Sequence, residues 1–140
     1  MKQKLTFRQY LDEGALIRRD DNEHTIERIF DFLNARKEQM AFVTEKMLRP
    51  PLEAVVVDLE TEFRNTFRRY KLFKDQAQEP ISREEQNEGN FLKQSIGRMI
   101  GFIMKKEGFK AKMVNQKEKR GELQGKLKNI FTKTIFYERA

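Results

Sequence analysis

Apolar residues recur at helical spacing through two long stretches of the chain, and Pro50 and Pro51 separate these stretches. In the first, apolar side chains return every three or four positions with charged residues between them: Ile26, Ile29, Phe30, Leu33, Met40, Val43 and Met47. The second shows the same period at Leu52, Val55, Val56, Leu59, Phe63, Phe67, Tyr70 and Phe73. A residue before proline avoids the helical conformation, whereas proline suits the first helical position. The pattern therefore predicts two amphipathic helices, at about 22–48 and 51–74.

A tight turn between these helices would make an antiparallel helical hairpin. The run Val55-Val56-Val57 has strand propensity, but the helical period of the whole stretch outweighs it. A short helix at 6–13 is expected before the hairpin, capped by Thr6 and ended by Gly14. Residues 1–78 are therefore expected to form a helical region. Its hairpin is either a plain two-helix core or a surface for homodimerisation or for a protein partner.

The polar segment 75–80 marks the boundary with the second part of the chain. Ser82 and Glu85 fit a capping box, so we expect a short helix that begins there and ends near Gly89. Asn90 is suited to cap a second, longer helix, which Gly108 ends. The buried stripe of this longer helix is predicted to contain Phe91, Leu92, Ile96, Met99, Ile100, Ile103 and Met104.

Beyond Gly108 the period of the sequence changes. Apolar and polar residues alternate from Phe109 to Met113, which predicts a strand, and residues 130–137 are rich in β-branched and aromatic types, which predicts a second strand. The polar loop 115–128 would join them as a hairpin with a basic tip. The expected fold class is therefore mainly α with a small β-hairpin. A helical region covers residues 1–78 and a basic, winged-helix-like region covers residues 79–140.

Composition excludes several kinds of site. The chain of 140 residues has no Cys and a single His, which rules out Cys-based zinc sites, Fe–S clusters and multi-His metal motifs. Asp58, Glu60 and Glu62 are interpreted as solvated helix charges, because only Asp58 and Glu62 share a side. We therefore expect no enzymatic activity, no catalytic residue, no metal and no cofactor. No apolar run reaches the roughly 20 residues of a membrane span and no secretory signal follows Met1, so a cytoplasmic protein without membrane partners is expected.

The charge of the chain is unevenly distributed. Residues 1–90 hold 16 Lys and Arg against 18 Asp and Glu, a net charge of −2, whereas residues 91–140 hold 13 against 4, a net charge of +9. An asymmetry of this kind is typical of proteins with an anionic partner, most often nucleic acid. The alternative is a solvated basic surface.

From residue 81 onward the expected order is short helix, longer helix, glycine, strand, basic loop and strand. Three segments resemble the helix-to-wing region of winged helix-turn-helix domains in phage and plasmid replication or regulatory proteins: Ile96-Gly97-Arg98, the run from Lys105 to Phe109, and Ile135-Phe136-Tyr137. The resemblance covers residues 81–140. It implies that the longer helix lies in the major groove of DNA and the hairpin on an adjacent backbone. The loop 115–128 is longer than the wing of those domains.

Gln94 and Arg98 are the candidates for base readout, because Gln pairs with adenine and Arg with guanine, and four positions apart they share one side of a helix. The other basic residues of the helix and of the loop suit phosphate contact: Lys93, Lys105, Lys106, Lys117, Lys119, Arg120, Lys126 and Lys128. Gly97 and Gly101 indicate either close approach to a DNA backbone or close packing between helices.

These observations predict a non-enzymatic protein that binds duplex DNA, as a transcriptional regulator or replication accessory factor of a mobile genetic element. The alternative is a protein-interaction module that inhibits or adapts a larger nucleic-acid enzyme, with the Phe-rich hairpin as its binding surface. RNA binding is a third reading, and the sequence offers no evident exposed aromatic platform for it.

Overall fold

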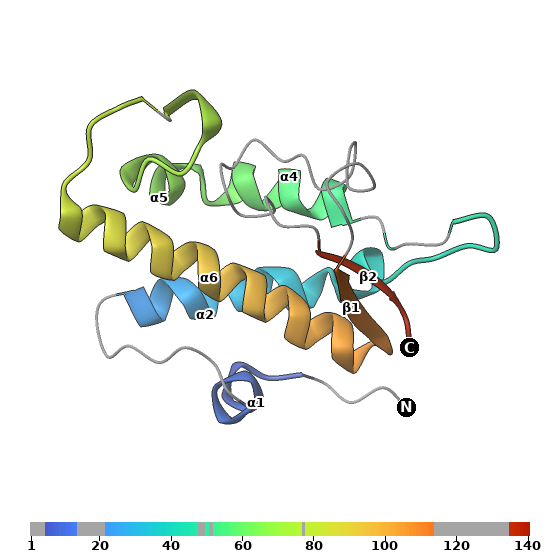
Figure 1. The fold of residues 1–140 in the computed structure, drawn as a ribbon. Helices are drawn as coiled ribbons and strands as arrows, with labels where there is room; N and C mark the ends of the chain where they lie inside the picture. The colour runs from blue at the N-terminus through green and yellow to red at the C-terminus, as the bar shows by residue number, and fades with distance from the viewer. Residues whose placement is uncertain (1–4, 14–21, 48–49, 51, 77, 114–134) are drawn as a thin grey trace.

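The protein is described by a computed structural model that covers residues 5–13, 22–47, 50, 52–76, 78–113 and 135–140 (Figure 1). In these residues the elements are α1 (Phe7–Asp12), α2 (Asn22–Ala35), α3 (Lys37–Met40), α4 (Leu52–Glu62), α5 (Arg64–Arg69), the 3-10 helix η1 (Lys74–Gln76), α6 (Arg83–Lys106), β1 (Phe109–Met113) and β2 (Ile135–Arg139). The expectation of a mainly helical protein with a small antiparallel sheet is confirmed.

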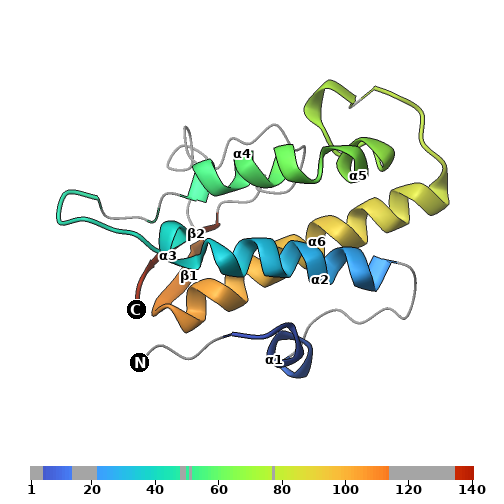
Figure 2. The same cartoon turned by 180° about the vertical axis from the view of Figure 1, so that it is seen from behind.

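Helices α2 and α6 lie side by side at the centre of the molecule, and the other elements pack around them (Figures 1 and 2). In Figure 1, α6 lies on the side toward the viewer, α1 lies below the pair, and α4 and α5 lie above it. Helix α4 runs back along α2, as the expected hairpin requires. The sheet follows the carboxyl end of α6 directly.

The core consists of the apolar faces that the helical period predicts. On α6, six of the seven stripe residues are buried and Phe91 is half-buried. All eight residues predicted between Leu52 and Phe73 are buried, and the run Val55-Val56-Val57 is helical despite its strand propensity. These helices are therefore held by tertiary burial of an amphipathic face rather than by local propensity.

The first predicted long helix is shorter than expected. Helix α2 ends at Ala35, one further turn follows as α3, and the chain leaves the helix at Ala41, so Val43 and Met47 lie in the connection to α4. The cause is Arg36. Its Nη1 donates to the carbonyl oxygen of Phe32 at 3.1 Å, while its backbone N–H bonds to Leu33 instead. A side chain has replaced the backbone donor at that carbonyl, which tightens and ends the helix.

The second predicted helix is interrupted at Phe63 and resumes as α5. It ends at Tyr70, because Lys71 has a left-handed backbone with φ 57°. The backbone N–H of Leu72 bonds to the carbonyl of Phe67 at 3.0 Å, and that of Lys71 to the carbonyl of Arg68 at 3.1 Å. These two bonds form a Schellman motif, which satisfies the last carbonyls of the helix. The expected end at about residue 74 is therefore a few residues late.

The predicted break at Gly89 is wrong. A single helix, α6, runs through Gly89 and Asn90 from its Ser82 cap to Lys106. Gly89 is buried, and a Cβ there would lie 3.1 Å from a methyl carbon of Leu72 and 3.2 Å from Cβ of Tyr70. This glycine therefore permits close approach of the α5–η1 connection and does not end a helix. The predicted pair of helices at 82–106 is one helix.

The two strands pair antiparallel, with Phe109 opposite Arg139 and Ala111 opposite Tyr137. Gly108 takes a φ of 92°, and its carbonyl accepts from the backbone N–H of Ala140, so the hairpin starts immediately at the end of α6. Strand β1 begins where the alternation predicts it. The expected start of the second strand at residue 130 lies outside the described residues.

In the part of the chain that the structure describes, no helix has the length and apolar character needed to cross a membrane. The same residues contain no group of three or more His, Asp or Glu side chains placed to hold a metal ion.

Candidate nucleic-acid interface

Three of the predicted contact residues lie on one exposed stripe of α6. Gln94, Arg98 and Lys105 follow each other at four and seven positions, which at about 3.6 residues per turn places them within about 40° of one another. All three side chains are exposed. We call Gln94, Arg98 and Lys105 the α6 stripe. In Figure 1 the side of α6 away from α2 faces the viewer.

Helix α1 borders the stripe on one side. The ring centroids of Tyr10 and Phe102 are 5.5 Å apart in an edge-to-face arrangement. Burial raises the pKa of Tyr10 to about 12, and the nearby Arg98 guanidinium opposes part of this rise. Arg98 thus acts electrostatically on α1 while its side chain stays exposed.

Strand β2 borders the stripe on the other side. A Cβ at Gly101 would lie 3.3 Å from the hydroxyl oxygen of Tyr137. Burial raises the pKa of the Tyr137 hydroxyl, so this side chain presents a neutral phenol to the helix at ordinary pH. The expectation of close packing is thus met at Gly101, with a strand in place of a second helix.

Gly97 differs from Gly101. A Cβ at Gly97 would meet no atom of the described residues within 4 Å. A glycine inside a helix costs about 1 kcal/mol relative to alanine, and here no contact within the described chain requires it. Gly97 lies among Lys93, Gln94 and Arg98. It therefore leaves a low point in the surface beside the stripe.

Lys93 and Lys106 lie away from the centre of the stripe. Lys93 is half-buried and is one position before Gln94, so it is about 100° around the helix from it. Lys106 Nζ lies 3.0 Å from Glu13 Oε1 and 5.5 Å from the ring centroid of Phe102. The ammonium of Lys106 is therefore directed at α1.

The surface around the stripe is basic over a long segment. From Gly89 to Lys106 the helix carries four basic residues and no acidic one. The acidic residues of α6, Glu84, Glu85 and Glu88, belong to its first turns, where they complement the helix dipole. The positive charge is thus concentrated toward the end of the helix from which the hairpin starts.

The predicted wing contacts lie outside the described residues: Lys117, Lys119, Arg120, Lys126 and Lys128. In the described part of the hairpin, Lys110 Nζ is 3.9 Å from Glu138 Oε1 across the two strands. The exposed charges at the base of the hairpin are therefore partly compensated.

One acidic residue was misjudged from the sequence. Asp58 and Glu62 are exposed, as predicted, but Glu60 is only 4% exposed. Its position was detectable, because it lies four residues after Val56 and three before Phe63 and so shares their buried face. Glu60 lines a pocket of about 400 Å³ together with Arg64, Arg68 and Lys74. The prediction of a solvated charge is wrong for this residue.

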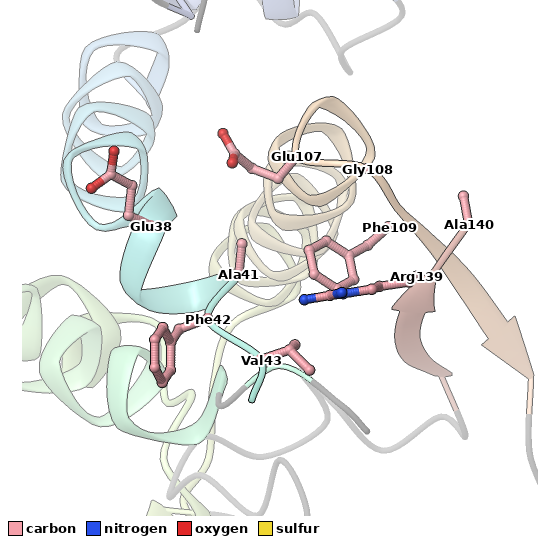
Figure 3. A pocket seen from close by; sticks show the side chains of 9 residues that line it. All are labelled: Glu38, Ala41, Phe42, Val43, Glu107, Gly108, Phe109, Arg139 and Ala140. Carbon is pink, nitrogen blue, oxygen red and sulfur yellow. The ribbon is translucent and has the colours of Figure 1, made fainter. Parts of the chain in front are cut away.

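The Phe-rich hairpin contributes mainly to the core. Phe30, Phe63, Phe67 and Phe73 are buried, and Phe32 is half-buried with the Arg36 guanidinium 3.6 Å from its ring centroid. Most of the aromatic residues that suggested a partner surface are thus engaged within the chain, and Phe42 is the exception, at 59% exposed, beside the pocket of about 620 Å³ that Figure 3 shows. No protein-family model matches the chain, and no curated protein or solved structure shows a significant similarity to it.

Proposed function

We propose that the protein binds duplex DNA through the α6 stripe, with the basic hairpin on the adjacent backbone, and that it acts by occupying DNA and not by a reaction. The observation that carries this proposal is Gly97. It is a helical glycine at which an added Cβ would meet no atom of the described residues within 4 Å, and its neighbours on the helix include Lys93, Gln94 and Arg98. A residue without a side chain at this position lets a sugar-phosphate backbone approach the helix.

The geometry of an α-helix fits this role, because a helix is narrow enough for the major groove, which is about 12 Å wide. Gln94 and Arg98 would contact base edges and Lys105 a phosphate. As α6 is one continuous helix, it would enter the groove alone, and helix α2, which packs along it, would support it. In this respect the proposal departs from a standard winged helix-turn-helix.

The first experiment measures the affinity for a labelled duplex as a function of salt concentration. Five or six neutralised phosphates give a slope of log K against log salt near −5. Arg98→Ala should reduce discrimination between sequences by about 1–3 kcal/mol, the value of one bidentate contact. Lys105→Ala should weaken all sequences and reduce the slope by about 1. Lys119→Ala should do the same if the loop is a wing.

Arg83→Ala is the matched control. Arg83 is exposed in the first turn of the same helix, beside Glu84 and Glu85, and is far along the helix from the stripe. The Arg83→Ala substitution removes the same charge as Arg98→Ala and should leave discrimination between DNA sequences unchanged. Gly97→Leu keeps a good helix former and should abolish binding while the circular dichroism spectrum is preserved. A salt-independent affinity, or equal effects of Arg83→Ala and Arg98→Ala, would refute the proposal.

A further inference from the structure

Helix α1 packs on the α2–α6 pair through a cluster of four aromatic rings. Tyr10 stacks on Phe30 with ring centroids 5.6 Å apart, and Phe102 lies edge-on to Tyr10 at 5.5 Å. Phe7 completes the cluster, with its ring centroid 5.7 Å from that of Phe30. Figures 1 and 2 show from both sides that α1 lies across this pair from α4 and α5. The docked position of α1 therefore depends on this cluster and on the polar contacts around it.

The polar groups of this interface are not all satisfied. Tyr10 is 3% exposed, and its hydroxyl is buried without a hydrogen-bond partner among the described residues. Asn34 Nδ2 donates to the carbonyl oxygen of Leu5 at 2.9 Å, but Oδ1 of the same amide is also buried without a partner there. If α1 undocks, both oxygens can bond to water, and the penalty of burying them unpaired is removed. The interface thus contains two groups that favour the undocked state.

The docked helix acts on two basic side chains of α6. Lys106 Nζ lies 3.0 Å from Glu13 Oε1, and these side chains are 39% and 48% exposed, so the ion pair is weak and open to competition by another anion. Burial raises the pKa of Tyr10 to about 12 and the Arg98 guanidinium opposes part of that rise, which indicates that Arg98 lies near the docked ring. Helix α1 therefore competes with an anionic ligand for this side of α6.

The length of α1 makes its undocking measurable. It has six residues, and isolated helices shorter than about 12–15 residues are marginal in water, so α1 is expected to lose its helical structure when it leaves the pair. In the docked helix the backbone N–H of Tyr10 bonds to the carbonyl of Thr6 at 3.2 Å, and that of Glu13 to the carbonyl of Gln9 at 3.1 Å. Hydrogen exchange at these two amides therefore reports undocking without any ligand.

We propose that α1 is an autoinhibitory helix. Docked, it holds Glu13 on Lys106 and Tyr10 near Arg98, and its undocking makes both basic side chains available to phosphates beside the α6 stripe. The inference rests on the proposed function, because the DNA backbone is the anion. Undocking and binding are then reciprocally linked: the duplex favours the undocked state, and the apparent affinity falls in proportion to the undocked fraction.

The first experiment measures hydrogen exchange by NMR as a function of urea, without a ligand. The amides of Tyr10 and Glu13 should exchange through a local opening that is nearly independent of urea, whereas Met99, in the middle of α6, should exchange through global unfolding. Tyr10→Phe removes the unpaired hydroxyl and keeps the ring, so it should slow exchange at Glu13 at least about fivefold. Tyr70→Phe is the matched control, because it removes a hydroxyl across the molecule from α1 and should leave this exchange unchanged.

The second experiment adds anions. Tripolyphosphate, a short polyanion that needs no helix in a groove, should speed exchange at Glu13 relative to sodium chloride of the same ionic strength. Lys106→Gln should remove this acceleration relative to its own baseline. The duplex should also speed exchange at Glu13. Tyr10→Phe should lower the affinity for the duplex about fivefold, although it changes no charge, because it makes undocking rarer.

The outcomes separate autoinhibition from duplex binding. Autoinhibition is wrong if the α1 amides exchange only with global unfolding, if the duplex slows their exchange, or if Tyr10→Phe leaves the duplex affinity unchanged, even when the duplex binds through Arg98. If tripolyphosphate speeds α1 exchange in a Lys106-dependent way and the duplex does not bind, only the duplex proposal fails.

Discussion

Lys106 Nζ lies 3.0 Å from Glu13 Oε1, an ion pair between the last turn of α6 and the residue that ends α1, 93 positions earlier in the chain. A second link holds the residues that lead into α1, because Asn34 Nδ2 on α2 donates to the carbonyl oxygen of Leu5 at 2.9 Å. Tyr10 adds a stacked contact with Phe30, with ring centroids 5.6 Å apart. Helix α1 is therefore docked on α2 and α6 at the border of the α6 stripe.

Glu13→Gln should raise the affinity for duplex DNA, because it removes the carboxylate that competes with phosphate for Lys106. The salt slope should become steeper by up to about 1, the contribution of one further phosphate contact. The free energy of unfolding should fall by less than about 1 kcal/mol, since both partners are partly exposed.

Asp12→Asn is the control for this effect. It removes the same charge from the neighbouring residue, whose carboxylate lies 3.6 Å from Nε of Arg8 and not beside Lys106. If Asp12→Asn and Glu13→Gln raise the affinity equally, the cause is the net charge and not the release of Lys106.

Two glycine-to-alanine changes in α6 should have opposite signs. Gly97→Ala should increase the free energy of unfolding by about 1 kcal/mol, because alanine is the better helix former and its Cβ meets no described atom within 4 Å. Gly89→Ala should decrease it by about 1–3 kcal/mol, because its Cβ would press on Leu72 and Tyr70. Urea unfolding of both variants measures this. Equal signs would mean that the α5–η1 connection does not approach α6 at Gly89.

Lys71→Gly should stabilise the protein. Lys71 has a φ of 57°, a conformation that costs most L-residues about 1–2 kcal/mol and glycine almost nothing. The lost ion pair with Glu79, at 3.1 Å, contributes little because Glu79 is exposed. We expect a gain of up to about 1 kcal/mol in thermal or urea unfolding. Lys74→Gly in η1, where φ is not positive, should be destabilising by contrast, and a gain there would show that the effect is not specific to the left-handed residue.

Tyr10→Phe should change the response of stability to alkaline pH. Burial raises the pKa of Tyr10 from 10.0 to about 12 in the folded protein, so the folded state holds this proton more tightly than the unfolded state. The resulting stabilisation is complete below pH 10 and is lost as the pH rises toward about 12. Tyr10→Phe should remove this part of the alkaline loss. Burial also raises the pKa of Tyr137, so Tyr137 should retain its own contribution to the loss of stability at alkaline pH.

At neutral pH, Tyr10→Phe should be neutral or stabilising, because the buried hydroxyl has no hydrogen-bond partner among the described residues. Urea midpoints measured from neutral pH to pH 12 decide both points. A loss of more than about 1 kcal/mol at neutral pH would indicate that the hydroxyl is engaged after all.

The interruptions of the helices were harder to predict than their faces. The stripe from Leu92 to Met104 follows from a period that every turn of a helix repeats, and the structure confirms it. The end of α2 coincides with a hydrogen bond from the Arg36 side chain, and Gly89 lies inside α6 where a Cβ would press on Leu72 and Tyr70. Gly89 has the same local sequence signal whether it ends a helix or lets another segment approach.

For the candidate site too, some features follow from the sequence and others only from the tertiary structure. Spacing alone places Gln94, Arg98 and Lys105 on one stripe, and the charge distribution alone assigns the basic character to residues 91–140. The pairing of Lys106 with Glu13 and the close approach of Tyr137 to Gly101 join residues far apart in the chain. The sequence by itself determined which residues are helical, apolar or basic, because these properties depend on neighbours within a few positions. The tertiary structure decided which charges are paired, which glycine is open and which aromatic ring stays exposed, because those depend on contacts that form only when distant segments pack.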